Sequence, residues 1–339
     1  MSRLRVLVVR LDAIGDVLLA GPAVRAVADR AEVVLLTGPR GTRAAELLPG
    51  VSAVLTWAAP WIEPAPAPDC HPDHLGALLT AVRGRPCDEA VVLTSFHQSA
   101  LPTALALRLA GIPRITAISE DYPGSLLDVR VADPGDVPEP RRGLVVASAA
   151  GFPLPDHDRG GLAVRRPLPD TTELTGPGRY VVLHPGTSVS ARAWSTSRWA
   201  HTARQLHRQG VRVVVTGGPD EAPLTRTVAG GVGSDLGGRT TLPQLADVLD
   251  RADAVVVANT GPAHLAAAVG TRVVSLFAPT VPAARWAPYG VPLELLGDQQ
   301  APCRGTRATR CPVPGHPCLA AVRPDDVLAA LDRLGAVAA

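Results

Sequence analysis

One pattern in the sequence limits the fold more than any other, and it occurs twice. A short apolar run is followed by a turn of small and polar residues and then by a segment with helical spacing, first from residues 4–9 and again from residues 180–183. Continuous apolar runs of this length are typical of parallel strands buried on both faces. Because strands that alternate with helices build such sheets, the sequence predicts an α/β protein with two doubly wound domains.

The chain has 339 residues, which is long for one hydrophobic core and suits two domains. Further apolar runs extend both halves, at residues 32–37, 53–57, 90–93, 211–215, 254–257 and 272–277. Between the halves, residues 153–177 are rich in Pro, Gly and Asp, which is typical of a linker. We therefore expect domains at residues 1–165 and 166–325, followed by a final helix at residues 326–339.

Composition excludes several classes of function. A net charge of +2 and an aromatic content of 3% argue against a nucleic-acid partner. The chain contains no lysine, so it has neither a Schiff-base lysine nor the lysine of a P-loop. The N-terminal residues lack the long apolar core of a signal peptide, and no apolar run approaches the roughly 20 residues of a membrane span, so we expect a cytoplasmic protein.

The turn at Asn259-Thr260-Gly261-Pro262 follows an apolar strand and opens a helix. Pro262 suits a first helical turn, Gly261 allows a ligand close to the backbone, and Thr260 can cap the helix or bond a phosphate. Free N–H groups and the positive end of the helix dipole would then face an anion at the carboxyl end of a parallel strand. An ordinary capped helix is the alternative, and the local sequence leaves both open.

Two further loops of the second half follow apolar strands in the same way. The loop after His184 combines hydroxyl groups with a guanidinium, which suits a diphosphate. The loop after residues 211–215 offers small residues and a carboxylate that could bond ribose hydroxyls. With the turn described above, these loops predict one ligand site that contains Thr187, Ser188, Arg192, Gly217, Gly218, Glu221, Asn259, Thr260, Gly261 and Pro262.

The first half carries one candidate for acid–base chemistry. Asp16 follows the first apolar strand. It is either an acidic residue favoured by the dipole in a first helical turn or a carboxylate available as a base. The loop Phe96-His97-Gln98 follows the strand expected at residues 90–93, where contacts to a second substrate would lie. A solvated loop is the alternative for these three residues.

These motifs resemble those of glycosyltransferase family 9, the heptosyltransferases of lipopolysaccharide core assembly. Residues 10–18 are similar to the opening motif of the family, and residues 184–187 with the following Arg192 are similar to its central motif. Residues 259–268 resemble its most specific motif, which residues 277–280 continue. The resemblance covers nearly the whole chain.

The resemblance implies the GT-B fold, in which two Rossmann-like doubly wound domains face a central cleft. The N-terminal domain is expected to bind the acceptor and the C-terminal domain a nucleotide-sugar donor such as ADP-heptose, while the last helix packs back on the first domain. Transfer is expected to invert the anomeric centre without a metal or other cofactor. Asp16 is expected to be the general base, with acceptor contacts from Gly15, Phe96, His97 and Gln98. His264 matches a further position of the donor motif.

Two positions depart from the usual family pattern. Arg192 stands where a lysine is common, and it keeps the charge while offering a bidentate grip. Asn259 stands where the family often has an aspartate that contacts the sugar. This change removes a negative charge near the sugar, so the sugar of this protein could differ from the usual heptose.

The first half shows no dense basic cluster of the kind that a phosphorylated lipopolysaccharide acceptor would require. The acceptor could therefore be another glycolipid, a polymer or a small natural product. A glycolipid acceptor would bring peripheral contact with a membrane. We expect a monomer without a nucleic-acid partner.

Cys303, Cys311, His316 and Cys318 lie close together in the sequence. Their spacing is unlike the short paired spacing of common zinc sites. We therefore interpret the three cysteines as buried or surface thiols rather than as ligands of a metal centre.

Two rival functions stay open on the same architecture. One is a sugar-nucleotide epimerase and the other is a non-catalytic protein that binds a sugar nucleotide. A dehydrogenase is disfavoured because the turn after the first strand lacks the G-x-G-x-x-G pattern.

Overall fold

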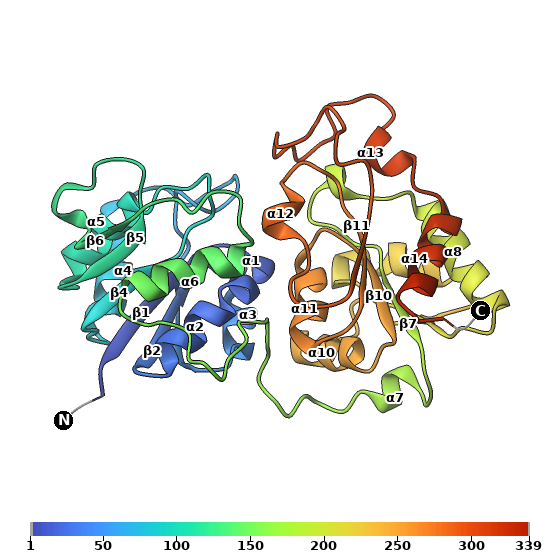
Figure 1. The fold of residues 1–339 in the computed structure, drawn as a ribbon, viewed down its shortest axis with the longest axis horizontal. Coiled ribbons are helices and arrows are strands. Elements are labelled where there is room, and N and C mark those ends of the chain that lie inside the picture. Colours follow the sequence, from blue (N-terminus) through green and yellow to red (C-terminus); the bar gives the residue numbers. More distant parts are fainter. Residues whose placement is uncertain (1–2, 338–339) are drawn as a thin grey trace. The chain divides into compact units, whose positions relative to one another are not determined.

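Two parallel β-sheets carry the fold of the computed structural model, which describes residues 3–337 (Figure 1). The chain divides between Arg165 and Arg166 into two compact units, each built around one sheet. The division falls within the stretch rich in Pro and Gly that the sequence marks as a linker. The short helix α7 (Thr172–Thr175) follows it and leads into the second sheet.

The first sheet has the strand order β3-β2-β1-β4-β5-β6, and its neighbouring strands are parallel. This is the order of a Rossmann-like, doubly wound sheet. Its strands are β1 (Arg5–Arg10), β2 (Glu32–Thr37), β3 (Val51–Thr56), β4 (Glu89–Val92), β5 (Ile115–Ile118) and β6 (Val129–Val131). Its helices are α1 (Ile14–Leu19), α2 (Gly21–Ala28), α3 (Thr42–Leu47), α4 (Pro72–Arg83), α5 (Leu101–Ala110), the 3-10 turn η1 (Gly124–Leu126) and α6 (Glu139–Ala149).

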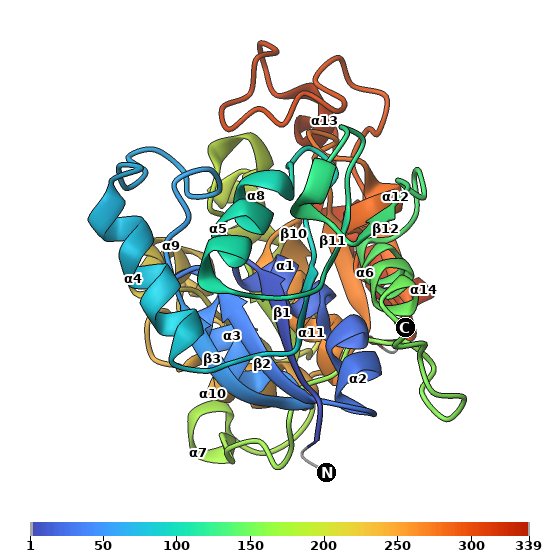
Figure 2. The same cartoon turned by 90° about the vertical axis from the view of Figure 1, so that its left-hand side faces the viewer.

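Helices cover both faces of the first sheet, and Figure 2 shows α4 and α6 on opposite sides of it. Leu7 and Val9 of β1 belong to a core with Leu78 of α4 and Leu107 of α5. On the other face, α2 and α6 pack against each other and against strands β2 and β4. The strands are therefore apolar on both sides, which explains why the sequence shows continuous apolar runs rather than alternation.

The second sheet repeats this topology with the order β12-β11-β10-β7-β8-β9 and parallel neighbours. Its strands are β7 (Val181–His184), β8 (Val213–Val215), β9 (Ser234–Asp235), β10 (Ala254–Ala258), β11 (Val273–Leu276) and β12 (Leu293–Leu296). Its helices are α8 (Thr196–Arg208), α9 (Ala222–Ala229), α10 (Leu242–Asp250), α11 (Gly261–Val269), α12 (Ala283–Trp286), α13 (Pro317–Ala320) and α14 (Pro324–Arg333), with 3-10 turns η2 (Ser190–Arg192) and η3 (Pro219–Glu221). Each unit is thus a complete doubly wound domain.

The last helix lies in the second unit. Val327, Ala330 and Leu331 of α14 are fully buried in the core of the second sheet. The helix packs against α8 and against strands β11 and β12. Its apolar face is occupied there, and the helix is part of the second hydrophobic core.

We predict that Leu331→Ala lowers the free energy of unfolding of the second unit by about 2–5 kcal/mol, because it leaves a cavity beside α8. Leu328→Ala is the matched control on the same helix, and it should cost less because Leu328 is only partly buried. Denaturant unfolding followed by tryptophan fluorescence measures both, since Trp194 and Trp199 pack edge to face in this core at 5.2 Å. Equal effects of the two substitutions would contradict the assignment.

Candidate functional site

Each sheet has a switch point, where two neighbouring strands lead into helices on opposite faces, and open α/β sheets bind ligands at the carboxyl ends of those strands. In the first sheet the switch point lies between β1 and β4, and in the second between β7 and β10. Asp16 and Gln98 follow β1 and β4, while Arg192 and Thr260 follow β7 and β10. The structure therefore places the predicted residues of each half at the switch point of its own sheet.

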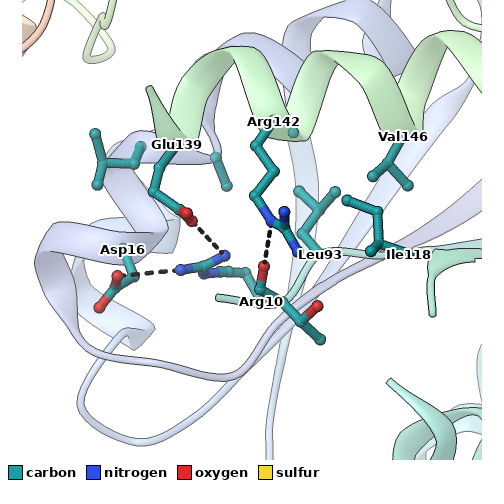
Figure 3. A pocket seen from close by; sticks show the side chains of 11 residues that line it. Arg10, Asp16, Leu93, Ile118, Glu139, Arg142 and Val146 are labelled. Carbon is teal, nitrogen blue, oxygen red and sulfur yellow. Dashed lines mark hydrogen bonds and ion pairs between the residues drawn. The ribbon is translucent and has the colours of Figure 1, made fainter. Parts of the chain in front are cut away.

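Arg10, the last residue of β1, is the centre of an ion-pair cluster in the first unit (Figure 3). Its Nη2 lies 3.0 Å from Asp16 Oδ1 and its Nη1 lies 3.4 Å from Glu139 Oε2. Its Nε lies 3.0 Å from Asp12 Oδ2, and Nη2 also donates to the hydroxyl of Ser95 at 2.7 Å. One guanidinium thus joins the loops after β1 and β4 to helices α1 and α6.

This cluster is buried, and burial sets its electrostatics. Burial alone would lower the pKa of the Arg10 guanidinium, but the carboxylates of Asp12, Asp16 and Glu139 outweigh it and raise the pKa. Burial raises the pKa of the Asp12 carboxyl, although the charge of Arg10 opposes this. Arg10 therefore stays charged and compensates the carboxylates around it.

A small pocket opens beside Arg10, with room for about one water molecule between its lining atoms. One wall is charged, with Arg10, Asp16, Glu139 and Arg142 (Figure 3). The remaining lining is mostly apolar, from Leu19, Ala20, Leu93, Thr94, Ile118, Gly143 and Val146. The side chain of Asp16 is 25% exposed whereas that of Glu139 is 2% exposed. Asp16 is thus the carboxylate of this wall that solvent or a substrate hydroxyl can reach.

The other residues predicted to contact an acceptor have different surroundings. Gln98 donates to Asp12 Oδ1 at 2.5 Å and accepts from the backbone N–H of Ser95 at 2.9 Å, so it supports the Arg10 cluster. Phe96 is partly exposed and meets the exposed His97 edge to face at 5.3 Å. Gly15 is buried in the first turn of α1. The structure brings Gln98 into the cluster around Asp16, whereas Phe96, His97 and Gly15 do not line the pocket.

Sequence reasoning missed Glu139 and Arg142. Glu139 begins α6, more than 120 residues after Arg10, inside a segment that reads as a loop rich in Pro and acidic residues. Arg142 donates to the carbonyl of Thr94 at 3.4 Å and to Asp133 at 2.6 Å. No local motif marks these residues, and only the packing of α6 beside β1 and β4 brings them to the site.

In the second unit, the three predicted loops meet at the switch point between β7 and β10. Arg192 Nη1 donates to the backbone carbonyl of Asn259 at 3.1 Å. Helix α11 begins at Gly261 after Thr260, which has an extended conformation and makes no side-chain capping hydrogen bond. Pro262 lies in the first turn, as expected from the sequence. The amino end of α11 and a guanidinium therefore lie together, which is an arrangement that suits an anion.

Glu221 lies between the loops after β7 and β8. Its Oε2 accepts from the backbone N–H of Gly218 at 2.7 Å. A Cβ atom at Gly186 would lie 2.0 Å from Glu221 Oε1, and a Cβ atom at Gly217 would lie 3.1 Å from Oε2. A side chain at Gly186 would therefore displace the Glu221 carboxylate from its present position.

His184, the last residue of β7, supports this carboxylate from inside the domain. Its Nδ1 is hydrogen bonded to the hydroxyl of Thr216 at 2.9 Å, and its Nε2 lies 4.0 Å from Glu221 Oε2. Burial lowers the pKa of His184 to about 4, although the charge of Glu221 opposes the shift. The imidazole is therefore neutral near pH 7.

The Asn259 side chain joins the ends of two neighbouring strands. It is buried and binds the backbone of Ala278 twice, with Nδ2 donating to the carbonyl at 3.3 Å and Oδ1 accepting from the N–H at 3.4 Å. An amide can both donate and accept, whereas a carboxylate only accepts. Asn259 therefore clamps the ends of β10 and β11, and the expected contact with the sugar stays a prediction.

Among the remaining predicted donor residues, one bonds the backbone, one is exposed and one is buried. Thr187 donates its hydroxyl to the carbonyl of Val189 at 2.8 Å, and Ser188 is exposed. His264 is buried within α11. These positions leave Ser188 accessible to a ligand and place His264 in the packing beneath the turn.

The cysteine region forms part of the second core. Cys303 and Cys318 are buried there, Cys311 donates to the carbonyl of Val313, and His316 bonds the carbonyl of Ala191 at 3.0 Å. Among residues 3–337, no group of three or more His, Cys, Asp or Glu side chains is arranged to hold a metal ion. In the same range, no helix has the length and apolar character needed to cross a membrane.

Comparison with solved structures identifies the architecture. The glycosyl transferase family 9 protein of Veillonella parvula DSM 2008 matches with a TM-score of 0.77 at 17% identity, over 97% of this chain and 96% of that one. The Escherichia coli heptosyltransferase WaaC with ADP-2-deoxy-2-fluoro heptose matches with a TM-score of 0.73 at 19% identity, over 97% and 99%. The two doubly wound units thus have the GT-B fold.

Sequence comparison identifies the family. Over 107 residues the chain is 34% identical to lipopolysaccharide heptosyltransferase 3 of Escherichia coli, which covers 30% of this chain and 32% of that protein. Over 142 residues it is 32% identical to lipopolysaccharide heptosyltransferase 1 of Pseudomonas aeruginosa, covering 40% and 38%. These matches span about a third of the length of the relatives. The model of "Glycosyltransferase family 9 (heptosyltransferase)" matches residues 79–315, more than half of the chain, so this protein belongs to glycosyltransferase family 9.

Proposed function

We propose that this chain is an inverting, metal-independent glycosyltransferase that moves a heptose or a related sugar from an ADP-activated donor to an acceptor hydroxyl. The observation that carries the proposal is the Asp16 carboxylate, which lines a pocket at the switch point of the first sheet and is held by Arg10. Membership of family 9 supports sugar transfer. The solved WaaC structure with an ADP-fluoro-heptose supports an ADP-heptose donor.

Asp16 is proposed to act as the general base. An acceptor hydroxyl must lose its proton as it attacks the anomeric carbon, and one positioned carboxylate can take that proton. The bond from oxygen to the anomeric carbon forms as the bond to the diphosphate breaks, so one displacement inverts the centre. A diphosphate is a good leaving group and needs no protonation, so a second catalytic carboxylic acid is not required.

The second unit is proposed to bind the donor. The leaving diphosphate gains negative charge, which Arg192 and the amino end of α11 would stabilise without a metal. Ser188 would add a hydroxyl contact, while Glu221, fixed by Gly218, would bond the ribose. Thr260 is available for a phosphate because its hydroxyl does not cap α11.

The first unit is proposed to bind the acceptor, which we take to be a glycolipid such as a lipopolysaccharide core, a polymer or a small natural product. The relatives are named as lipopolysaccharide heptosyltransferases. A monomeric cytoplasmic enzyme with peripheral membrane contact would fit a glycolipid acceptor.

The proposal is tested by incubating the protein with ADP-heptose and a panel of acceptors, and by measuring ADP release and product mass. Activity that survives a chelating agent supports metal independence. Conversion of the donor in the absence of any acceptor would favour an epimerase instead. Donor binding without turnover across the panel would favour a non-catalytic sugar-nucleotide-binding protein.

We predict that Asp16→Asn lowers kcat about 100- to 10,000-fold because the amide cannot accept the acceptor proton. Donor affinity, measured by titration calorimetry, should stay unchanged because the donor residues lie in the other unit. Asp158→Asn is the matched control, since Asp158 pairs with Arg25 in the same unit at 2.6 Å and does not line the pocket. Normal turnover in Asp16→Asn would remove Asp16 from the mechanism.

We predict that Asn259→Asp costs about 1–2 kcal/mol of stability and weakens donor binding. The carboxylate loses the bond to the carbonyl of Ala278 and adds a negative charge beside the diphosphate site. Gln299→Ala is the control, because Gln299 also bonds backbone carbonyls next to β11, those of Phe277 and Gly297. It should lower stability and leave the donor Kd unchanged. Tighter donor binding by Asn259→Asp would show instead that residue 259 contacts the sugar.

A further inference from the structure

We propose that Arg10 and Glu139 act together as positioning residues for Asp16: Arg10 orients its carboxylate, and Glu139 pairs with the same cation and places an opposing charge near that carboxylate. The inference rests on the proposed role of Asp16 as the base. It is carried by one geometric fact, which is that a single buried guanidinium is shared among three carboxylates from separate segments of the first unit.

Arg10 restrains the direction of the Asp16 carboxylate. Nη2 of Arg10 holds Oδ1 of Asp16 at 3.0 Å, and the same nitrogen is fixed by the buried hydroxyl of Ser95. This contact limits the positions that the Asp16 carboxylate can take beside the pocket. Because a base must lie within hydrogen-bond reach of the proton that it takes, this restraint acts on the reaction itself.

Arg10 and Glu139 also set the charge around Asp16. A cation beside a carboxylate favours its ionised form, and a neighbouring anion disfavours it. Arg10 pairs with Asp12, Asp16 and Glu139, so the other two carboxylates bring negative charges that oppose Arg10 at Asp16. The side chain of Glu139 is 2% exposed, so water screens its charge poorly. Glu139 is thus placed to oppose Arg10 at Asp16 without touching a substrate.

Other charged groups lie on the elements that pack around this cluster. Arg142 of α6 is paired with Asp133, and Arg40 of the loop after β2 is paired with Glu63. Helix α3, which packs on α1, carries Arg43 and Glu46, both of them exposed. Helix α2 carries Arg25, which is paired with Asp158. Substitution of Arg10 or Glu139 leaves the charges of these groups unchanged, so the two substitutions report on the cluster itself.

The test is the pH dependence of kcat/KM for sugar transfer by the full chain, whose acid limb reports protonation of the base. Arg10→Gln should move the acid limb upward by about one pH unit or more, because the carboxylate loses its cation. Glu139→Gln should move the acid limb in the opposite direction, because the negative charge that opposes Arg10 at Asp16 is then removed. Arg10→Lys should leave the limb near its original position and lower kcat, since an ammonium keeps the charge but cannot bridge four groups.

Arg25→Gln is the matched control, because it removes another partly buried arginine from a carboxylate pair in the same unit. It should lower stability without moving the acid limb, and the KM for the donor should stay unchanged in every variant. Where Arg10→Gln fails to fold, Glu139→Gln and the double variant R10Q/E139Q decide, because neither leaves three carboxylates without compensation.

An acid limb that stays in place in Glu139→Gln overturns the inference and reduces Glu139 to a structural partner of Arg10. Asp16→Asn, measured in parallel, distinguishes failure of the proposed function from failure of this inference alone. Retained turnover there overturns the proposed base and the proposed function with it. Lost turnover there, together with an unmoved limb in Glu139→Gln, overturns only the inference drawn from the cluster.

Discussion

Burial of short parallel strands on both faces is the constraint on which the rest of this structure depends. Residues within β1 and β10 are almost fully buried, so a polar side chain has no place in the interior of these strands. Polar groups that meet a ligand must then lie where the strands end, on the loops at their carboxyl edge. Arg10 and His184 illustrate this, because each is the last residue of its strand and its side chain lies at a candidate site.

The two units have the same topology but carry different groups at the carboxyl edge of the sheet. In the first unit, side chains dominate, because Arg10 gathers three carboxylates into one buried cluster beside a pocket. In the second, backbone groups dominate, because glycines make room for Glu221 and an uncapped helix presents its amino end near Arg192. A carboxylate-rich site suits proton removal, and a site of N–H groups and a guanidinium suits a diphosphate. This difference supports an acceptor role for the first unit and a donor role for the second.

Much of the fold was predictable because the apolar runs of the central strands are unambiguous. Strands β5, β6, β9 and β12 were not predicted. The edge strands β6, β9 and β12 are brief and only partly buried, and the buried β5 contains a polar residue, so none of the four has a continuous apolar run. The sequence also did not show that the last helix packs beside α8 or that the Asn259 amide bonds Ala278, because both contacts join separate segments of the chain.

The sequence by itself determined the two doubly wound domains and the loops that carry the candidate site, because local patterns of apolar, small and charged residues specify both. Only the tertiary structure decided which side chains surround Asp16. Glu139 and Ser95 lie 129 and 85 residues from Arg10 along the chain, and they meet it because α6 and β4 pack beside β1. Contacts between segments so far apart follow from the packing of the sheet and its helices, which no local pattern of residues records.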